Sequence, residues 1–210
     1  MSRAAFLDRD GVLNYKPVEG QYVIRWDQFH LLPGASEAVR LLNRAGFLVI
    51  IASNQRCVAK GLITSGEMDA MHARMLLEFE AVGARIDAIY YCPHETHSLC
   101  FCRKPQPGML LDAARTHNIN LADSWMIGDS GCDVQAGRAA GCKTVHLMPD
   151  HLRRDVAADI VTSSLFGAAL KILLKHAASP SPLPQIRSGT AVSVPGRPEE
   201  RRPRFTVHGV

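Results

Sequence analysis

Short apolar runs alternate with amphipathic segments along most of the chain, from residue 4 to about residue 176. The apolar runs are of strand length and rich in β-branched and aromatic residues, as expected of parallel strands that are buried on both faces. We predict strands at residues 4–7, 47–52, 86–91, 125–127, 144–147 and 160–161. This alternation predicts an α/β fold, a doubly wound parallel sheet of Rossmann-like type with helices on both faces.

The segments between the strands carry the end signals of helices. One segment ends at Gly46, and glycine is a common helix stop. Another begins after Thr64, because Thr64 and Glu67 have the spacing of a capping box. The methionines that follow Glu67 fall on one helix face, and we interpret them as core rather than as a cofactor site. The segment that ends at Gly46 is a predicted helix at residues 34–45, and two further helices are predicted at residues 107–117 and 133–140.

Polar side chains directly follow four of the predicted strands. In a doubly wound sheet, ligands bind beyond the carboxyl ends of the strands. At these ends the chain has Asp8-Arg9-Asp10-Gly11, Ser53-Asn54-Gln55, Cys92-Pro93-His94 and Gly128-Asp129-Ser130. Because the four ends lie at one edge of the sheet, the pattern favours a single functional site over four solvated turns.

Most of the net charge belongs to the last part of the chain. Residues 177–210 carry +3 of the formal +4, because they hold five arginines against two glutamates. They also hold six of the twelve prolines and lack apolar periodicity. We therefore predict one domain over residues 1–176 and a disordered tail over residues 177–210. The tail has no dense run of lysine and arginine, so we expect no nucleic-acid partner.

The apolar runs are too short for a membrane span. The longest aliphatic stretch, residues 47–52, is far below the roughly 18 residues that a span requires. The sequence also shows no signal peptide. We expect a cytoplasmic monomer without a membrane partner.

Six cysteines in a chain of this kind suggest metal binding before disulfides. Cys92, His94, Cys100 and Cys102 have the spacing C-x-H-x5-C-x-C and are the ligand types of tetrahedral Zn²⁺. Four protein ligands leave no open position, so we predict a structural zinc that staples the loop before Lys104. A reduced, metal-free cysteine cluster is the alternative. We interpret the other three cysteines as small buried residues.

Four segments resemble, in this order, the motifs of the haloacid dehalogenase superfamily of phosphatases: FLDRDGVLN, IIASNQ, CRKPQPG and MIGDSGCDVQAGRAAG. The resemblance covers residues 4–175. The CPH and CFC segments before RKP make the chain similar to the zinc-containing branch, which includes heptose bisphosphate and histidinol phosphate phosphatases. No large segment separates the motifs, so we expect a haloacid dehalogenase-type fold with a minimal cap.

The resemblance implies a magnesium-dependent phosphatase that hydrolyses a sugar phosphate monoester through an aspartyl phosphate. Asp8 would be the nucleophile, and Asp10 the acid and the base in turn. Ser53 would hydrogen-bond a phosphate oxygen, and Lys104 would neutralise the phosphate. Two carboxylates as close as Asp8 and Asp10 become tolerable when a divalent cation lies beside them.

The same resemblance implies the ligands of Mg²⁺. These are the carboxylate of Asp8, the backbone carbonyl of Asp10 and the carboxylate of Asp129, all of them hard oxygen ligands. Asp133 would be an outer acceptor. The alternative for Asp133 is a simple acidic residue in the first turn of a helix.

The substrate-binding residues are expected to be Asn54, Gln55, Lys60 and Arg103. A sugar bisphosphate is favoured over histidinol phosphate, because a second phosphate would find cations at Arg103, Lys60 and Arg56. The chain departs from the family at Arg56 and Cys57, where related sequences have small residues, and at Lys60, where they have an arginine. These departures make it less secure to infer the substrate of this chain from the family. From another class of function, the alternative is a zinc-stapled binding module without catalysis.

Overall fold

The computed structural model describes residues 1–149, 157–177 and 207–209. In these ranges the strands form one sheet, in the order β6-β5-β4-β1-β2-β3-β7, and all the neighbouring pairs are parallel. The strands are β1 (Arg3–Leu7), β2 (Phe47–Asn54), β3 (Ala88–Cys92), β4 (Trp125–Gly128), β5 (Lys143–Leu147), β6 (Ile160–Thr162) and β7 (Val207–Gly209).

The α-helices in the described ranges are α1 (Ala35–Arg44), α2 (Ser65–Ala81), α3 (Gly108–His117), α4 (Gly131–Ala140) and α5 (Leu165–Ala177). Two short 3₁₀ helices, η1 (Trp26–Gln28) and η2 (Leu121–Asp123), lie in the connections. None of these helices has the length and apolar character needed to cross a membrane.

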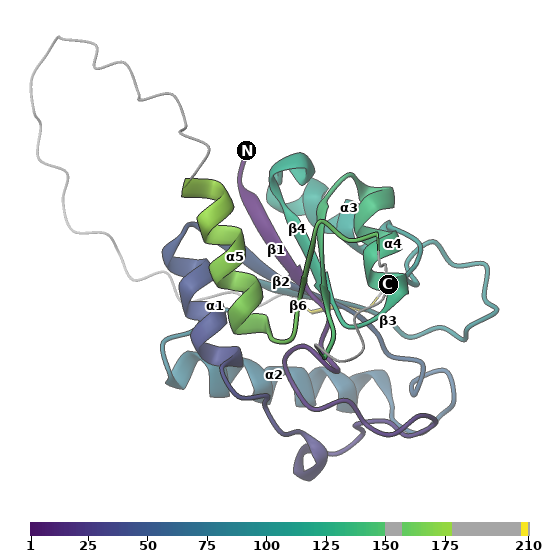
Figure 1. Ribbon diagram of the computed structural model, residues 1–210. Helices are drawn as coiled ribbons and strands as arrows, with labels where there is room; N and C mark the ends of the chain where they lie inside the picture. The colour runs from purple at the N-terminus through teal and green to yellow at the C-terminus, as the bar shows by residue number, and fades with distance from the viewer. Residues whose placement is uncertain (150–156, 178–206, 210) are drawn as a thin grey trace, which may run out of the picture.

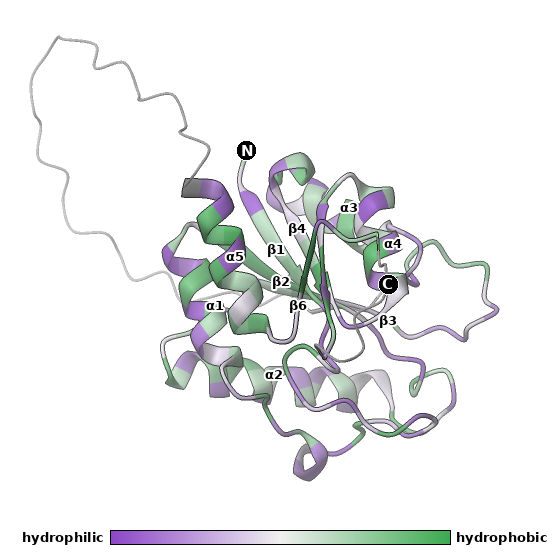
Figure 2. Ribbon diagram, viewed as in Figure 1, coloured by the Kyte–Doolittle hydropathy of each residue, from purple (hydrophilic) through white to green (hydrophobic). Residues whose placement is uncertain are grey.

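The sheet lies between two layers of helices (Figure 1). On one face, Ala5 and Leu7 of β1 belong to a core shared with α1, α2 and α5. On the other face, Ala4 and Phe6 pack in a core with α3 and the end of α4. Successive residues of a strand point to opposite faces, so a strand that is covered on both sides must be apolar throughout. Figure 2 shows the hydrophobic residues gathered along the central strands, and the predicted α/β fold is confirmed.

Helix α2 begins where the sequence predicts. The Thr64 side chain accepts a hydrogen bond from the Glu67 backbone N–H at 3.2 Å, and Glu67 accepts one from the Thr64 backbone N–H at 2.8 Å. Met68 and Met75 are both fully buried against the sheet. The methionine face is therefore core, as predicted.

The end of the chain differs from the prediction at both ends of the predicted tail. Ala177, its first residue, is the last residue of α5. Val207–Gly209 forms β7, which pairs with β3, although the sequence predicts a disordered tail there. The outer edge of β3 presents backbone N–H and C=O groups that a short extended segment can pair with, whether or not that segment has apolar periodicity. Residues 178–206 and 210, the rest of the predicted tail, lie outside the described residues, and the division into domain and tail stays a prediction.

Candidate active site

The site lies where the order of the strands reverses. From β1 the chain builds outward through β2 and β3, and β4 then lies on the other side of β1. Ligands bind at such a switch point, beyond the carboxyl ends of the two strands. Asp8 follows β1, Asp129 follows β4, and the backbone N–H of Asp8 donates to the carbonyl oxygen of Ile127 at 3.0 Å. The two strands thus hold these two carboxylates at one place.

Asp133 joins them. Ligand atoms of Asp8, Asp129 and Asp133 all lie within 4.8 Å of one another, and we call these residues the carboxylate cluster. Asp133 lies in the first turn of α4, where its side chain accepts from the Ser130 backbone N–H at 3.1 Å, and its side chain is only 1% exposed. The helix cap therefore delivers Asp133 to the cluster itself, so it is more than an acidic residue of a first turn.

Two glycines make room for the cluster. A Cβ on Gly11 would lie 2.3 Å from Asp129 Oδ2, and a Cβ on Gly128 would lie 2.2 Å from the Asp133 side chain. Gly11 also has a φ of +88°, which residues with a side chain rarely adopt. Any larger residue at either position would displace a carboxylate.

Lys104 supplies positive charge at the centre. Its Nζ lies 2.9 Å from Asp8 Oδ1 and 2.6 Å from Asp133 Oδ1, and it donates to the Ala52 carbonyl oxygen at 2.7 Å. Burial alone would lower the pKa of Lys104, but Asp133 and Asp8 raise it above its ordinary value. Burial raises the pKa of Asp8, and Lys104 opposes this effect. Lys104 is therefore a permanent cation beside Asp8.

The carboxylate cluster fits a magnesium ion. Asp129 Oδ1 is buried and has no hydrogen-bond partner within the described part of the chain, so it has a free acceptor for a cation. Burial also raises the pKa of Asp129, which a bound cation would reverse. Mg²⁺ prefers hard oxygen ligands of this kind. The carboxylate of Asp10 is not in the cluster, so a contribution from Asp10 is left to its backbone carbonyl, as the resemblance implies.

Asp10 is held by a separate set of donors. The Arg9 guanidinium donates to both of its oxygens, at 3.0 and 2.9 Å, and the side-chain amides of Asn14 and Gln55 donate at 2.9 and 3.0 Å. Burial alone would raise the pKa of Asp10, but the charge of Arg9 and these hydrogen bonds lower it below its ordinary value. Asp10 is thus an ionised carboxylate in this arrangement.

Arg9 itself is fully buried beneath the site. Its Nη1 lies 3.3 Å from His72 Nε2 and 3.3 Å from Met68 Sδ, both on α2. Burial and the charge of Arg9 lower the pKa of His72 to about 3, so the imidazole is neutral and accepts from Arg9. The sequence reasoning missed this pair, although an arginine between two aspartates was a signal.

The residues at the end of β2 hold other residues of the site in place through hydrogen bonds. Ser53 is buried, and its Oγ accepts from Gln55 Nε2 at 2.9 Å. Asn54 exchanges two hydrogen bonds of 3.0 Å with the backbone of Lys104 and so fixes that residue. Gln55 is only 2% exposed and contacts Ser53 and Asp10, so the structure places it under the site and not on a pocket wall.

The four predicted zinc ligands come together where β3 ends. Ligand atoms of Cys92, His94, Cys100 and Cys102 lie within 4.8 Å of one another, with His94 Nδ1 at 3.3 Å from Cys102 Sγ. Three thiols and one imidazole are a donor set that fits tetrahedral Zn²⁺. We call residues 93–103 the zinc loop, and it leads directly into Lys104.

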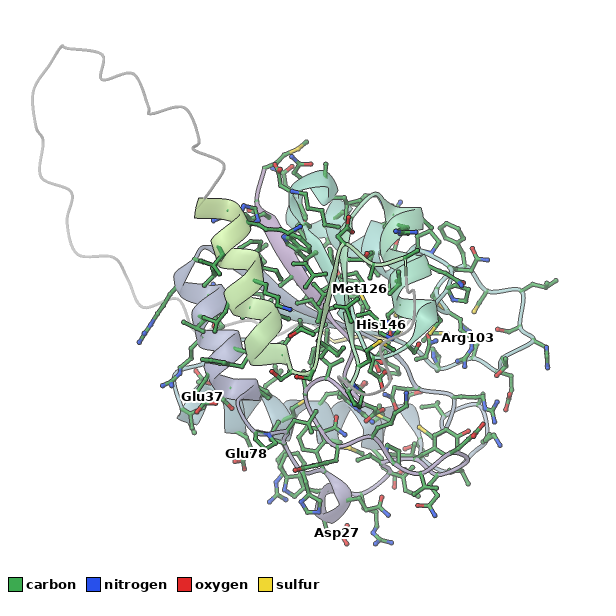
Figure 3. The ribbon with its side chains drawn as sticks, in the orientation of Figure 1. Asp27, Glu37, Glu78, Arg103, Met126 and His146 are labelled. Carbon is green, nitrogen blue, oxygen red and sulfur yellow. The ribbon has the colours of Figure 1, made fainter. Side chains whose placement is uncertain are left out.

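A cavity of about 600 Å³ lies between the zinc loop, the end of β2 and the start of α4, and Lys104 links it to the carboxylate cluster. Asn54, Arg103 and Lys104 line it. Arg103, the last residue of the zinc loop (Figure 3), donates to the His94 carbonyl oxygen at 3.2 Å. A larger cavity, of about 790 Å³, lies next to Arg3 at the amino end of the sheet and contains none of the predicted site residues.

Arg56 and Lys60 lie on the loop after β2. Arg56 donates to Tyr22 Oη at 3.1 Å and to Thr96 Oγ1 at 2.9 Å, so it ties the loop after β1 to the zinc loop. Lys60 is exposed, with its Nζ 5.8 Å from the centroid of the Tyr22 ring. Of the three cations expected to contact a second phosphate, Arg103 alone is among the residues that line the 600 Å³ cavity.

Two further residues at the site depart from the sequence interpretation. Cys132 is half-buried at the start of α4, with its Sγ 2.8 Å from Ser130 Oγ, and lines the same cavity, whereas Cys57 and Cys142 are buried as predicted. Lys16, which the sequence reasoning missed, has its Nζ 2.7 Å from Asp129 Oδ2. Only the fold relates Lys16 to Asp129, because 113 positions separate them in the chain.

Solved structures resemble this arrangement over most of the chain. The D,D-heptose 1,7-bisphosphate phosphatase from Bordetella bronchiseptica, complexed with magnesium and phosphate, has a TM-score of 0.75 and 32% sequence identity, covering 82% of this chain and 99% of that chain. The corresponding enzyme from Burkholderia thailandensis has a TM-score of 0.60 and 32% identity, covering 81% and 98%. A sequence profile described as HAD-hydrolase-like matches residues 101–165. Fold and site together define a phosphatase of the haloacid dehalogenase class.

Sequence relatives narrow the class. The D-glycero-beta-D-manno-heptose-1,7-bisphosphate 7-phosphatase of Rhodopseudomonas palustris is 43% identical over 145 residues, which are 66% of this chain and 79% of the relative. The Escherichia coli K12 enzyme of the same name is 37% identical over 173 residues, 77% of this chain and 89% of the relative. The chain belongs to the family of these heptose bisphosphate phosphatases.

Proposed function

We propose that the protein removes the 7-phosphate of D-glycero-D-manno-heptose 1,7-bisphosphate in a magnesium-dependent reaction with an aspartyl-phosphate intermediate. The observation that carries the proposal is the carboxylate cluster with Lys104 between Asp8 and Asp133. Relatives that bear the name of this activity are 37–43% identical to the chain, which supports the choice of substrate.

In the first step Asp8 attacks phosphorus. The bond between phosphorus and the sugar oxygen breaks as the bond to Asp8 forms, and Asp10 gives its proton to the leaving oxygen. Lys104, 2.9 Å from Asp8, stabilises the negative charge that the phosphoryl group brings. Asp8, Asp129 and the backbone carbonyl of Asp10 would hold Mg²⁺, with Asp133 as an outer acceptor, and the ion would supply further positive charge for the transferring phosphoryl group.

In the second step water attacks phosphorus, Asp10 accepts a proton from it, and the bond between Asp8 and phosphorus breaks. The lowered pKa of Asp10 in the free protein leaves it ionised and ready to accept that proton. The first step requires a protonated Asp10. The negative charge of a bound phosphate raises the pKa of Asp10 and so favours the protonated form. The same residue can therefore act as acid and as base.

Ser53 and Asn54 help to place the phosphate. Ser53 Oγ accepts from Gln55, and a hydroxyl that accepts one bond keeps its own hydrogen to donate to a phosphate oxygen. Asn54 fixes the backbone of Lys104. Gln55 acts through Asp10 and Ser53 and is a positioning residue.

Arg103 is the cation best placed for the second phosphate. It lines the cavity beside Lys104, and its contact with the His94 carbonyl couples its position to the zinc loop. Cys92, His94, Cys100 and Cys102 would give Zn²⁺ four protein ligands, which would leave no open position for catalysis and would make its role structural. Lys60 lies further out on the loop after β2 and could contact a substrate only at the rim.

We further propose that the protein acts as a monomer in the cytoplasm on a small phosphorylated sugar, without nucleic-acid or membrane partners. Residues 1–176 carry a net charge of only +1, which gives nucleic acid and anionic lipid little attraction.

The test is a side-by-side measurement of kcat/KM for heptose 1,7-bisphosphate and histidinol phosphate. A charge-assisted contact to the second phosphate contributes about 1.5–3 kcal/mol, so the bisphosphate should be preferred by roughly 10–100-fold. Arg103→Gln should reduce that preference, while Arg44→Gln, an exposed arginine on α1, should not. If histidinol phosphate is the better substrate, the assignment of heptose 1,7-bisphosphate as the substrate is wrong. The phosphatase mechanism would be unaffected.

A further inference from the structure

Lys16 is a second lysine at the carboxylate cluster, and it is held differently from Lys104. Its Nζ lies 2.7 Å from Asp129 Oδ2, and its side chain is 55% exposed. Lys104, by contrast, is 1% exposed and also donates to the carbonyl oxygen of Ala52. An exposed lysine can leave a carboxylate for water at little cost, whereas a buried one cannot.

Together the two lysines contact all three carboxylates and balance two of their three negative charges. Lys104 contacts Asp8 and Asp133, and Lys16 contacts Asp129. Without these cations, carboxylates within 4.8 Å of one another would repel strongly. The ammonium of Lys16 thus supplies at Asp129 Oδ2 part of the positive charge that a metal ion would supply, and it leaves Oδ1 without a partner in the described part of the chain.

We propose that Lys16 is a tethered cation that competes with Mg²⁺ for Asp129. The proposal rests on the magnesium site of the proposed function. An ion on the free Oδ1 would bring a second positive charge to the carboxylate that Lys16 already holds at Oδ2. The ion and the ammonium repel each other there, so the ion pair weakens the affinity of the protein for the metal.

The tether keeps the ammonium near the site. The chain before Lys16 is fixed, because the Tyr15 backbone N–H donates to the His30 carbonyl oxygen at 2.9 Å, and Pro17 restricts the backbone after it. The ammonium of Lys16 therefore competes with Mg²⁺ for Asp129 at a local concentration higher than that of free cations in solution.

Calorimetric titration of MgCl₂ into the full, zinc-loaded chain without substrate tests this directly. Lys16→Gln should lower the dissociation constant for Mg²⁺ by about 1.4- to fivefold, the range expected for a partly exposed ion pair. Lys16→Arg keeps the charge and should stay close to the unmodified protein. Lys60→Gln makes the same change on the neighbouring loop, where the lysine lies over Tyr22, and should leave the constant unchanged.

An unchanged or a raised dissociation constant in Lys16→Gln would overturn the proposal. So would an equal fall in Lys60→Gln, because the effect would then be one of general charge and not of the contact. Asp129→Asn should lose most of the binding. If Asp129→Asn binds Mg²⁺ as tightly as the unmodified protein, the magnesium site of the proposed function is misplaced as well, whereas failure of Lys16→Gln alone leaves that site intact.

Discussion

Asp8 and Asp10 lie two positions apart and have opposite surroundings. Asp8 faces Lys104 and two other carboxylates in a buried site that raises its pKa, whereas Asp10 faces Arg9 and two amides that lower its pKa. Carboxylates whose environments differ in this way can take different roles in one reaction. Local contacts therefore separate a nucleophile from an acid and base within a single turn of chain.

Substitution of each aspartate gives the first prediction. Asp8→Asn should abolish phosphate release, because an amide is not a nucleophile, while Asp10→Asn should lower kcat by about 10²–10⁴-fold, as general acid-base groups typically contribute. Asp27→Asn, an exposed position on η1, serves as the matched control. Steady-state assays with circular dichroism to check folding make the comparison, and near-normal turnover by Asp8→Asn would exclude Asp8 as the nucleophile.

The buried imidazole of His72 gives a prediction of stability against pH. Its pKa is lowered to about 3 from 6.5, so between these values only the unfolded chain takes up the proton. Stability is therefore present above the unfolded pKa and is lost as the pH falls below it, by about 2 kcal/mol at pH 5. Urea unfolding should show a larger loss of stability between about pH 7.5 and 5 in the unmodified protein than in His72→Gln.

The exposed His30 provides the control, because His30→Gln should keep the acid sensitivity of the unmodified protein. An identical pH dependence in all three proteins would mean that His72 takes up its proton in the folded state as readily as in the unfolded state.

Among individual residues, the sequence predicts those that belong to a recognisable motif. The carboxylates after β1 and β4 and the four zinc ligands come together as their spacing and strand-end positions indicate. Lys16 and His72 could not be predicted in the same way, because each reaches the site from a loop or a helix with no motif of its own. Their roles come from proximity in the fold, which spacing along the chain does not encode.

At the scale of elements, the zinc loop connects β3 to the residue that faces Asp8. Cys92 closes β3, Cys100 and Cys102 close the loop, and Lys104 follows. A loop of this length has little apolar surface to hold it in place, so the metal is its main constraint. The position of the zinc loop therefore determines where the positive charge of Lys104 lies relative to Asp8.

Removal of one zinc ligand tests this coupling. Cys102→Ser should lose the one zinc ion expected per chain and most of the activity, because Arg103 and Lys104 lose the loop that positions them. Cys142→Ser changes a buried cysteine outside the cluster and should retain the metal. Elemental analysis and phosphate release are measured together; full activity in a zinc-free Cys102→Ser preparation would contradict the structural role.

The positions of the strands are predicted well because a strand that is buried on both faces is a continuous apolar run, and such runs are easily recognised in the sequence. Boundaries are predicted less well. Strand β2 extends to Asn54, two residues beyond the apolar run, because its backbone pairing with β3 continues through the polar residues Ser53 and Asn54 as far as Cys92. Helix α4 likewise begins at Gly131, before the apolar positions, since Ser130 caps it. Caps and backbone ladders fix ends, and hydropathy does not report them.

For the whole molecule, the two core clusters lie within residues 1–177, and β7 adds only a short backbone pairing at the edge of β3. Deletion of residues 178–210 should therefore lower the melting temperature by less than about 4 °C, the shift that corresponds to roughly 1 kcal/mol in a chain of this size. Turnover should not change. A larger fall, or a loss of turnover, measured by calorimetry and assay of the shortened chain, would mean that the end of the chain completes the fold or the site.

Asp8 is the residue that carries the phosphoryl group in this mechanism. The most direct test is to measure the mass of the peptide that contains Asp8. Asp10→Asn, mixed with an aryl phosphate and Mg²⁺ and quenched in acid, should form the intermediate, because an aryl leaving group needs no acid, and should hydrolyse it slowly, because the base is missing. The account predicts one added phosphoryl group on the peptide with Asp8, and none when Asp8→Asn is combined with Asp10→Asn. A phosphoryl group on another residue, or steady release of phosphate with no modified peptide at any quench time, would contradict it.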